Sequence, residues 1–156
     1  MKRATVLVIF IGAALAVTSY STLRAQQAAA SSVADGIYTE QQAKRGETVY
    51  ADTCAACHGA TLAGGSGPGT PLVGMDFIVL WRTVGELFEK IKLGMPADRP
   101  GTLTPRQAAD VVAFVLSANN YPVGMIELGT DPAPMRLLRM VEPPSTPSTP
   151  TSAPTR

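Results

Sequence analysis

The sequence predicts a small all-α protein, with three to four helices and loops wrapped around one rigid group. Two stretches, 83–94 and 104–119, combine an N-terminal capping pattern with apolar residues at helical spacing. The chain of 156 residues also contains 13 prolines and 14 glycines. Helices in so small a chain cannot build a large core alone, so we expect these loops to pack around something rigid.

The two strongest helix predictions start at threonine. Residues 83–86 and 104–107 each match a capping box, and the second has proline at the first helical position. Gly94 is the expected C-cap of the first helix, and the second should end near Asn119. The apolar faces comprise Val84, Leu87, Phe88 and Ile91 in the first helix, and Ala108, Val111, Val112 and Val115 in the second.

An earlier helix is predicted from about Thr39 to Thr53. Gly46 lies inside it, where glycine lowers helix propensity. It indicates either a close crossing with another helix or a tolerated surface glycine. We expect Tyr50 and Phe114 to pack between the first and last predicted helices.

Both cysteines and the only histidine of the chain occur in Cys54-Ala55-Ala56-Cys57-His58. Cys-x-x-Cys-His is the attachment sequence of c-type haem, in which the thiols form thioethers to the haem vinyl groups and the imidazole binds the iron. No other cysteine or histidine competes for these residues. The alternative is a free or disulfide-linked pair as in thioredoxin-like folds, but the βαβ context of that fold is not visible here.

A stretch rich in glycine and proline, residues 59–74, follows the motif. It lacks the pattern of a phosphate-binding loop, and we expect it to cover one side of the haem. The backbone carbonyl of Thr70 or Pro71 is well placed to accept the Nδ1 proton of His58. Such a bond would fix the imidazole ring and raise its basicity.

The sixth iron position has several candidate ligands. A single histidine excludes bis-histidine ligation and leaves methionine, lysine or an open, water-bound site. Met95 is the preferred ligand, because the loop MPADRPG that it begins is stiffened by two prolines. Met75 is the rival, although packing on the macrocycle is the simpler interpretation of that residue. Three other methionines are expected to cover apolar surface: Met125, Met135 and Met140.

Trp81 and Arg82 are candidate ligands of a haem propionate. An indole N–H and a guanidinium are donors that a buried carboxylate needs. The alternative is a tryptophan in the core next to an arginine that faces solvent.

The N-terminus has the pattern of an export signal. Lys2 and Arg3 precede the apolar run Val6–Val17, and cleavage after Ala25 would remove residues 1–25. At about 12 residues the apolar run is short for a membrane span. An uncleaved membrane anchor is the alternative. Export agrees with the motif, because c-type haem is attached outside the bacterial cytoplasm.

The remaining segments follow from composition. Residues 26–38 are predicted to be a flexible lead-in, 39–120 the haem domain and 121–142 an extension packed on it. Residues 143–156 are rich in proline, serine and threonine and are predicted to be a disordered tail.

The charge of the exported chain is low and negative. Loss of residues 1–25 removes three basic residues and no acid, so the 13 basic residues become 10 against 12 acidic ones, a net charge of −2. Haem propionates would make the domain more acidic. This balance favours protein and small-molecule partners and argues against nucleic acid.

The order of these parts resembles class I c-type cytochromes over about Thr39 to Asn119. Gly46, Tyr50 and Phe114 match residues that form the helix crossing of that family. A narrower resemblance runs to Met140, through LVGMDF, Trp81, MPADRPGTLT and VAFVLSANNYPVGMIELGTDPAPMRLLRM. It is to the cytochromes associated with quinoprotein (pyrroloquinoline quinone) dehydrogenases.

The motif and the resemblance together predict a periplasmic carrier of single electrons and no enzymatic activity. One haem c is bound through Cys54 and Cys57, with His58 and Met95 as iron ligands. The expected donor is a dehydrogenase, of quinoprotein type by the narrower resemblance, and the acceptor a cytochrome or oxidase. Two alternatives are an electron-transfer subunit of a dehydrogenase complex, and a haem-based sensor in which a gas displaces Met95.

Overall fold

The computed structural model describes residues 30–65 and 67–143. The predicted signal at 1–25 and the predicted tail beyond residue 143 lie outside these residues. The chain divides into Met1–Ala30 and Ser31–Arg156, and the description below concerns the second unit. Over its described residues this unit is helical and has no strand, only two isolated bridges, which confirms the all-α prediction.

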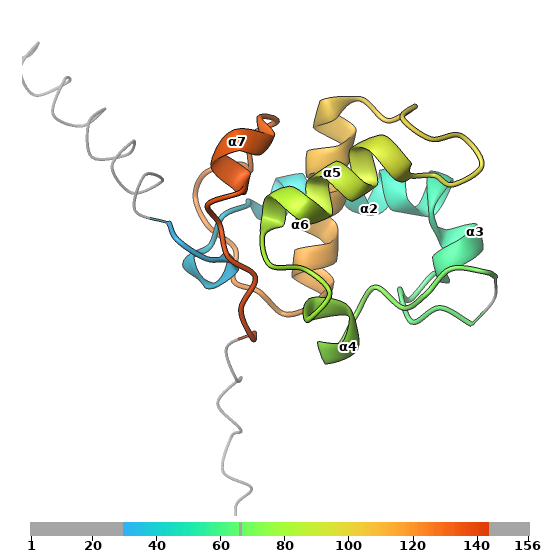
Figure 1. Cartoon of the computed structure of the whole chain (residues 1–156), viewed down its shortest axis with the longest axis horizontal. Helices are drawn as coiled ribbons and strands as arrows, with labels where there is room; N and C mark the ends of the chain where they lie inside the picture. The colour runs from blue at the N-terminus through green and yellow to red at the C-terminus, as the bar shows by residue number, and fades with distance from the viewer. Residues whose placement is uncertain (1–29, 66, 144–156) are drawn as a thin grey trace, which may run out of the picture. The chain divides into compact units, whose positions relative to one another are not determined.

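Three helices of more than ten residues are joined by shorter turns of helix (Figure 1). The central helix, α6, contacts both α2 and α5, and α7 packs against α5. None of the helices described is both long and apolar enough to cross a membrane. In chain order the elements are η1 (Val33–Asp35), α2 (Glu40–Thr53), α3 (Ala55–His58), α4 (Met75–Ile78), α5 (Val84–Gly94), α6 (Pro105–Ala118) and α7 (Pro132–Met135).

The first and last long helices begin where the sequence predicts, and each has a threonine as its N-cap. The Thr39 hydroxyl accepts a hydrogen bond from the backbone N–H of Gln42, which starts α2. At α6 the capping box is complete: Thr104 accepts from the N–H of Gln107, whose side-chain oxygen accepts from the N–H of Thr104. Asn119 is the C-cap of α6, as predicted.

The helix α5 begins after its predicted N-cap Thr83, but its capping box and its C-cap differ from the prediction. Thr83 accepts from the N–H of Glu86, but the Glu86 carboxylate bonds the N–H of Arg82 instead of returning to Thr83, so the capping box is incomplete. Gly94 is the last helical residue, and the C-cap is Met95 in extended backbone. Pro96 explains the shift, because proline disfavours helical backbone in the residue before it.

The crossing of α2 and α6 requires Gly46. A Cβ atom built there would lie 1.8 Å from the backbone oxygen of Asp110 and 2.9 Å from the Cβ of Phe114. Gly46 is therefore a close-crossing residue and not a tolerated surface glycine. Beside it the rings of Tyr50 and Phe114 pack with centroids 5.2 Å apart, as predicted.

The N-terminal lead-in is packed where it is described, which differs from the flexible segment expected at 26–38. Val33 and Tyr38 are fully buried. The Val33 N–H donates to the carbonyl of Arg139 at 3.0 Å, and the Arg139 N–H donates to Ser31 at 2.9 Å. Composition did not reveal this packing, because the partner segment is distant in the sequence.

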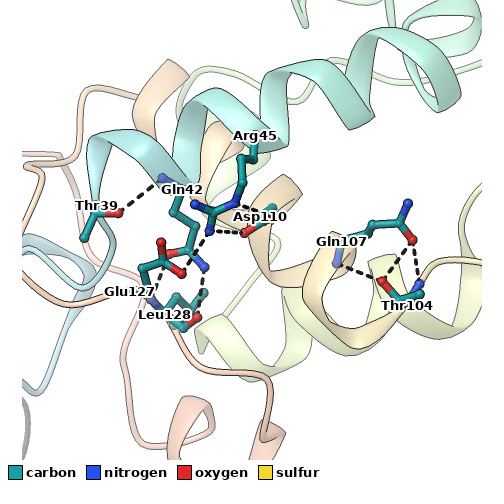
Figure 2. A network of polar contacts seen from close by, with 8 residues as sticks. All are labelled: Thr39, Gln42, Arg45, Thr104, Gln107, Asp110, Glu127 and Leu128. Carbon is teal, nitrogen blue, oxygen red and sulfur yellow. Dashed lines mark hydrogen bonds and ion pairs between the residues drawn. The ribbon is translucent and has the colours of Figure 1, made fainter.

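Residues beyond α6 return to α2 through a polar network (Figure 2). The buried side chain of Gln42 donates to the Leu128 carbonyl at 2.9 Å and accepts from the Leu128 N–H at 2.8 Å. Arg45 makes two hydrogen bonds to Asp110 of α6 and an ion pair with Glu127 at 2.9 Å. The network thus joins α2, α6 and the segment after α6.

The three methionines beyond α6 do not behave alike. Met135 is buried and Met140 is half-buried. Met125 is 87% exposed, so the expectation that it covers apolar surface is wrong. It lies in a segment without helical structure, whereas Met135 is the last residue of α7.

Candidate functional site

The Cys-x-x-Cys-His motif forms one helical turn directly after α2. Cys54 ends α2, where its N–H donates to the carbonyl of Tyr50, and its own carbonyl accepts from the N–H groups of Cys57 and His58. Both sulfur atoms lie outside any disulfide. Cys54 is half-buried, and burial raises the pKa of its thiol, whereas Cys57 is exposed. The turn therefore presents two thiols and one imidazole together.

The imidazole of His58 is oriented by the loop that follows it. Its Nδ1 lies 2.7 Å from the backbone oxygen of Thr70, which identifies Thr70 rather than Pro71 as the partner. A carbonyl can only accept, so Nδ1 carries the proton. The unprotonated Nε2 then has its lone pair available for a metal.

Glycines allow this loop to lie against the motif. The Gly69 N–H donates to the Cys57 carbonyl at 3.1 Å, and the Gly64 N–H donates to His58 at 2.8 Å. A Cβ atom at Gly69 would lie 2.8 Å from Nδ1 of His58. Gly69 does not stand out in the sequence, because its neighbour in space, His58, lies eleven residues earlier in the chain.

Asn119 is a second residue that the sequence analysis missed at this loop. It was expected only as the end of a helix. Its buried amide donates to the carbonyls of Leu72 and Val115, and its Oδ1 accepts from the N–H of Gly74. The far end of the loop is therefore held to α6 just before α4. In the sequence, the sign of this role was an asparagine at the predicted end of a helix, followed directly by a second asparagine.

Met95 stands on a different element from the motif. It is half-buried, and the loop that it begins is turned by a hydrogen bond from the Arg99 N–H to the Pro96 carbonyl at 2.9 Å. Pro96 is buried. Met75, the rival ligand, is the first residue of α4 and is 45% exposed.

Trp81 has an unsatisfied donor inside the protein. Its Nε1 is buried and has no hydrogen-bond partner among the described residues, while its ring packs against Phe77 with centroids 6.0 Å apart. Burying an indole N–H without an acceptor costs free energy. An acceptor such as a haem propionate fits this position, so the residues present suit the group that the motif implies.

Arg82 adopts the solvent-facing arrangement considered as the alternative. Its side chain is 90% exposed and forms an ion pair with Glu86 at 2.6 Å. The backbone N–H and the guanidinium of Arg82 hold the pKa of Glu86 below its usual value. Arg82 is therefore engaged on the surface, one residue from the unpartnered indole.

Among the residues that the structure describes, no group of three or more histidine, cysteine or acidic side chains could hold a metal ion directly. The imidazole of His58 and the two thiols beside it have the spacing of the attachment sequence of a c-type haem.

Comparison with known proteins agrees with this geometry. The family described as "Cytochrome C oxidase, cbb3-type, subunit III" matches residues 41–115, just under half of the chain. The matched stretch contains α2, the motif, Trp81 and the Met95 loop. Neither the curated proteins nor the solved structures include a match. Residues 41–115 are therefore similar to a c-type cytochrome domain, which supports an electron-transfer haem protein.

Proposed function

We propose that the chain is a periplasmic electron carrier with a single haem c. Cys54 and Cys57 would hold the group through thioethers, and His58 and Met95 would be the protein ligands of its iron. When bound, haem supplies reversible one-electron chemistry at its iron. Trp81 donates its indole N–H to a propionate. For Arg82 to do the same, it would have to leave Glu86.

The hydrogen bond from His58 to Thr70 is the observation that carries this proposal. It selects the tautomer of the imidazole that can bind iron and holds the ring on the same helical turn as the two thiols. A histidine with only a structural role would need neither this tautomer nor a position on the same helical turn as two thiols. Because Thr70 holds the ring, little reorganisation of the protein would accompany a change in oxidation state.

Methionine ligation suits a carrier that accepts electrons readily. The thioether favours Fe(II), so a His/Met pair raises the reduction potential. The half-buried position of Met95 and the buried Pro96 support it over the more exposed Met75. A ligand held in a loop with two prolines loses little conformational entropy on binding.

The proposed location and partners rest on the sequence. Lys2, Arg3 and the apolar run Val6–Val17 support export to the periplasm. The proposed donor is a dehydrogenase, of quinoprotein type by the resemblance that extends to Met140, and the acceptor is a cytochrome or an oxidase. Contacts with both would be weak and transient, as is typical of redox encounters.

The test begins with haem content and continues with ligand identity. A pyridine haemochrome assay on the purified holoprotein should give one c-type haem per chain. The ferric protein should show the weak long-wavelength band of iron–thioether bonding. Met95→Ala should remove this band and lower the reduction potential, because the ligand that favours Fe(II) is lost.

Met75→Ala is the matched control and should keep both the band and the potential. Absence of c-type haem would overturn the whole proposal. Loss of the band in Met75→Ala but not in Met95→Ala would instead reassign the ligand. A high-spin ferric spectrum that Met95→Ala leaves unchanged would favour a ligand-binding protein over a carrier.

A further inference from the structure

We infer that the surface around Met95 docks an acidic face of a redox partner protein, an inference that rests on the proposed carrier function. This surface, the Met95 rim, combines an exposed apolar residue with several cations on α5, on the loop after it and on the first turn of α6. Its members are Lys90, Lys92, Leu93, Arg99 and Arg106.

Positive charge is concentrated in the sequence around Met95. Residues 26–156 contain 10 basic and 12 acidic residues. The stretch 82–106 has five of the basic residues and three of the acidic ones, which leaves five basic and nine acidic residues elsewhere. This stretch therefore carries +2 in a chain whose remainder carries −4.

The acids of this stretch are compensated, whereas several cations are not. Lys90 and Arg106 have no ion pair among the described residues, and Lys92 donates only to the carbonyl of Gly101, at 3.3 Å. Their charge is therefore available to a partner. The three acids each pair with an arginine: Glu86 with Arg82, Glu89 with Arg136, and Asp98 with Arg99.

Contacts within the structure place the two lysines of the rim beside the loop that Met95 begins. The Nζ of Lys90 lies 3.7 Å from the point that a Cβ of Gly94 would occupy, so this ammonium reaches the last residue of α5. The bond from Lys92 to Gly101 joins the same end of α5 to the loop that Met95 begins. Leu93 directly follows Lys92 in sequence and is 67% exposed.

Helix stability does not account for the whole rim. Lys92 in the last turn of α5 interacts favourably with the helix dipole, as does any cation at that end. Arg106 stands in the first turn of α6, where the dipole disfavours a cation and where no acid compensates it. The position of Arg106 works against its own helix and adds charge to the rim.

The composition of the rim suits a protein partner. An apolar residue surrounded by charged side chains matches the apolar centre and polar rim of protein interfaces. Opposite charge on the partner would steer the encounter and raise the association rate. Nucleic acid is disfavoured by the net negative charge of the rest of the chain.

Electron transfer to small charged reagents tests the local charge. We would follow oxidation of the ferrous holoprotein by hexacyanoferrate(III) as ionic strength increases. A chain of net negative charge repels this anion, so its rate should rise with salt if charge were evenly spread. With electrons leaving at the Met95 rim, the rate should instead fall with salt.

Lys90→Glu should lower the rate at low salt by at least about threefold and flatten or reverse the salt dependence. Lys44→Glu is the matched control. Lys44 is also exposed, also follows a glutamate by four residues on a helix, and undergoes the same change of charge. It lies on α2, which carries no member of the rim, and should leave the salt dependence unchanged.

The peptide hexaglutamate serves as a model of the acidic face of the docking partner. In the ¹⁵N-labelled ferrous holoprotein this peptide should shift the amide signals of residues 90–106 and lose its effect in Lys90→Glu. Amide shifts confined to other surfaces, or a hexacyanoferrate(III) rate that rises with salt, would contradict the proposed docking at the Met95 rim. Either result in a protein with normal haem content and a reversible potential would leave the carrier function intact.

Discussion

Among single residues, Tyr50 links the helix crossing to the haem motif. Its ring packs on Phe114, and its hydroxyl donates to the carbonyl of Gly59 at 2.6 Å. Gly59 follows His58 directly and has a positive φ of 79°, which favours glycine. One side chain thus connects α2, α6 and the turn that presents the imidazole.

The ionisation of Tyr50 predicts an alkaline limit of stability. Burial raises its pKa from 10.0 to about 12. Folding therefore favours the neutral phenol, and this contribution is complete below pH 10 and is lost as the pH rises toward about 12. The free energy of unfolding of the holoprotein, measured with denaturant, should fall across this window.

Tyr50→Phe provides the comparison for that measurement. At pH 7 it should cost about 1 kcal/mol, because the hydrogen bond to Gly59 is lost. Between pH 10 and about 12 its stability should fall less steeply than that of the unmodified protein. Equal slopes in the two proteins would show that Tyr50 does not control the alkaline limit. Tyr121, whose pKa is also raised to about 12 by burial, would then be the residue to replace.

Among the helices, the contact of α2 with α6 has the least tolerance for change. Gly46 lets the two backbones approach closely, and Arg45 beside it bonds the Asp110 carboxylate of α6. Hydrogen bonds to charged groups contribute about 1.5–3 kcal/mol each where they are well formed. The crossing therefore combines close packing with a polar connection at the same level of both helices.

Gly46→Ala should destabilise the protein by about 1–3 kcal/mol or more, because its methyl group would overlap the Asp110 backbone. Thermal unfolding of the holoprotein measures the loss. Gly94→Ala is the control, since a Cβ there would meet Lys90 at an ordinary 3.6 Å. That substitution should be neutral or slightly stabilising, because alanine has the higher helix propensity. Similar losses of thermal stability in both variants would show that the close crossing of α2 and α6 is not the cause.

For the chain as a whole, segments outside the cytochrome match complete the core. The match covers residues 41–115, yet Val33, Tyr38, Leu128 and Met135 are all buried. Backbone hydrogen bonds join the lead-in to the last segment, and that segment also bonds Arg82 and Val84 next to Trp81. The flanking segments therefore form part of the folded domain.

Gln42→Ala should release the segment after α6. Removing its side chain leaves the buried N–H and carbonyl of Leu128 without partners, which should cost about 2 kcal/mol or more. Limited proteolysis should then cut faster within residues 121–131. Gln41→Ala, an exposed neighbour on α2, should behave like the unmodified protein. Unchanged proteolysis in Gln42→Ala would mean that other contacts hold the segment.

The long helices and the orientation of His58 were predictable because they depend on local chemistry. Threonine caps, apolar spacing and the motif act over a few residues, and the structure bears out the helix starts at Glu40 and Pro105. The partner of His58 was narrowed to two carbonyls, of which Thr70 is correct. A local pattern is less reliable where a neighbouring group competes for the same partner. The capping box predicted at Thr83 is incomplete because the Glu86 carboxylate accepts from the backbone N–H of Arg82 instead.

The remaining features depend on residues that meet only after the chain folds. Gly46 had two interpretations until Asp110 was placed against it, and the lead-in gave no sign of its pairing with Arg139. The unpartnered indole of Trp81 and the exposed cations around Met95 are likewise properties of burial and proximity. Sequence therefore determines the Cys-x-x-Cys-His motif and the helices, because both are set by near neighbours along the chain. Tertiary structure decides which backbones touch and which charges stay uncompensated, because these depend on distances in space.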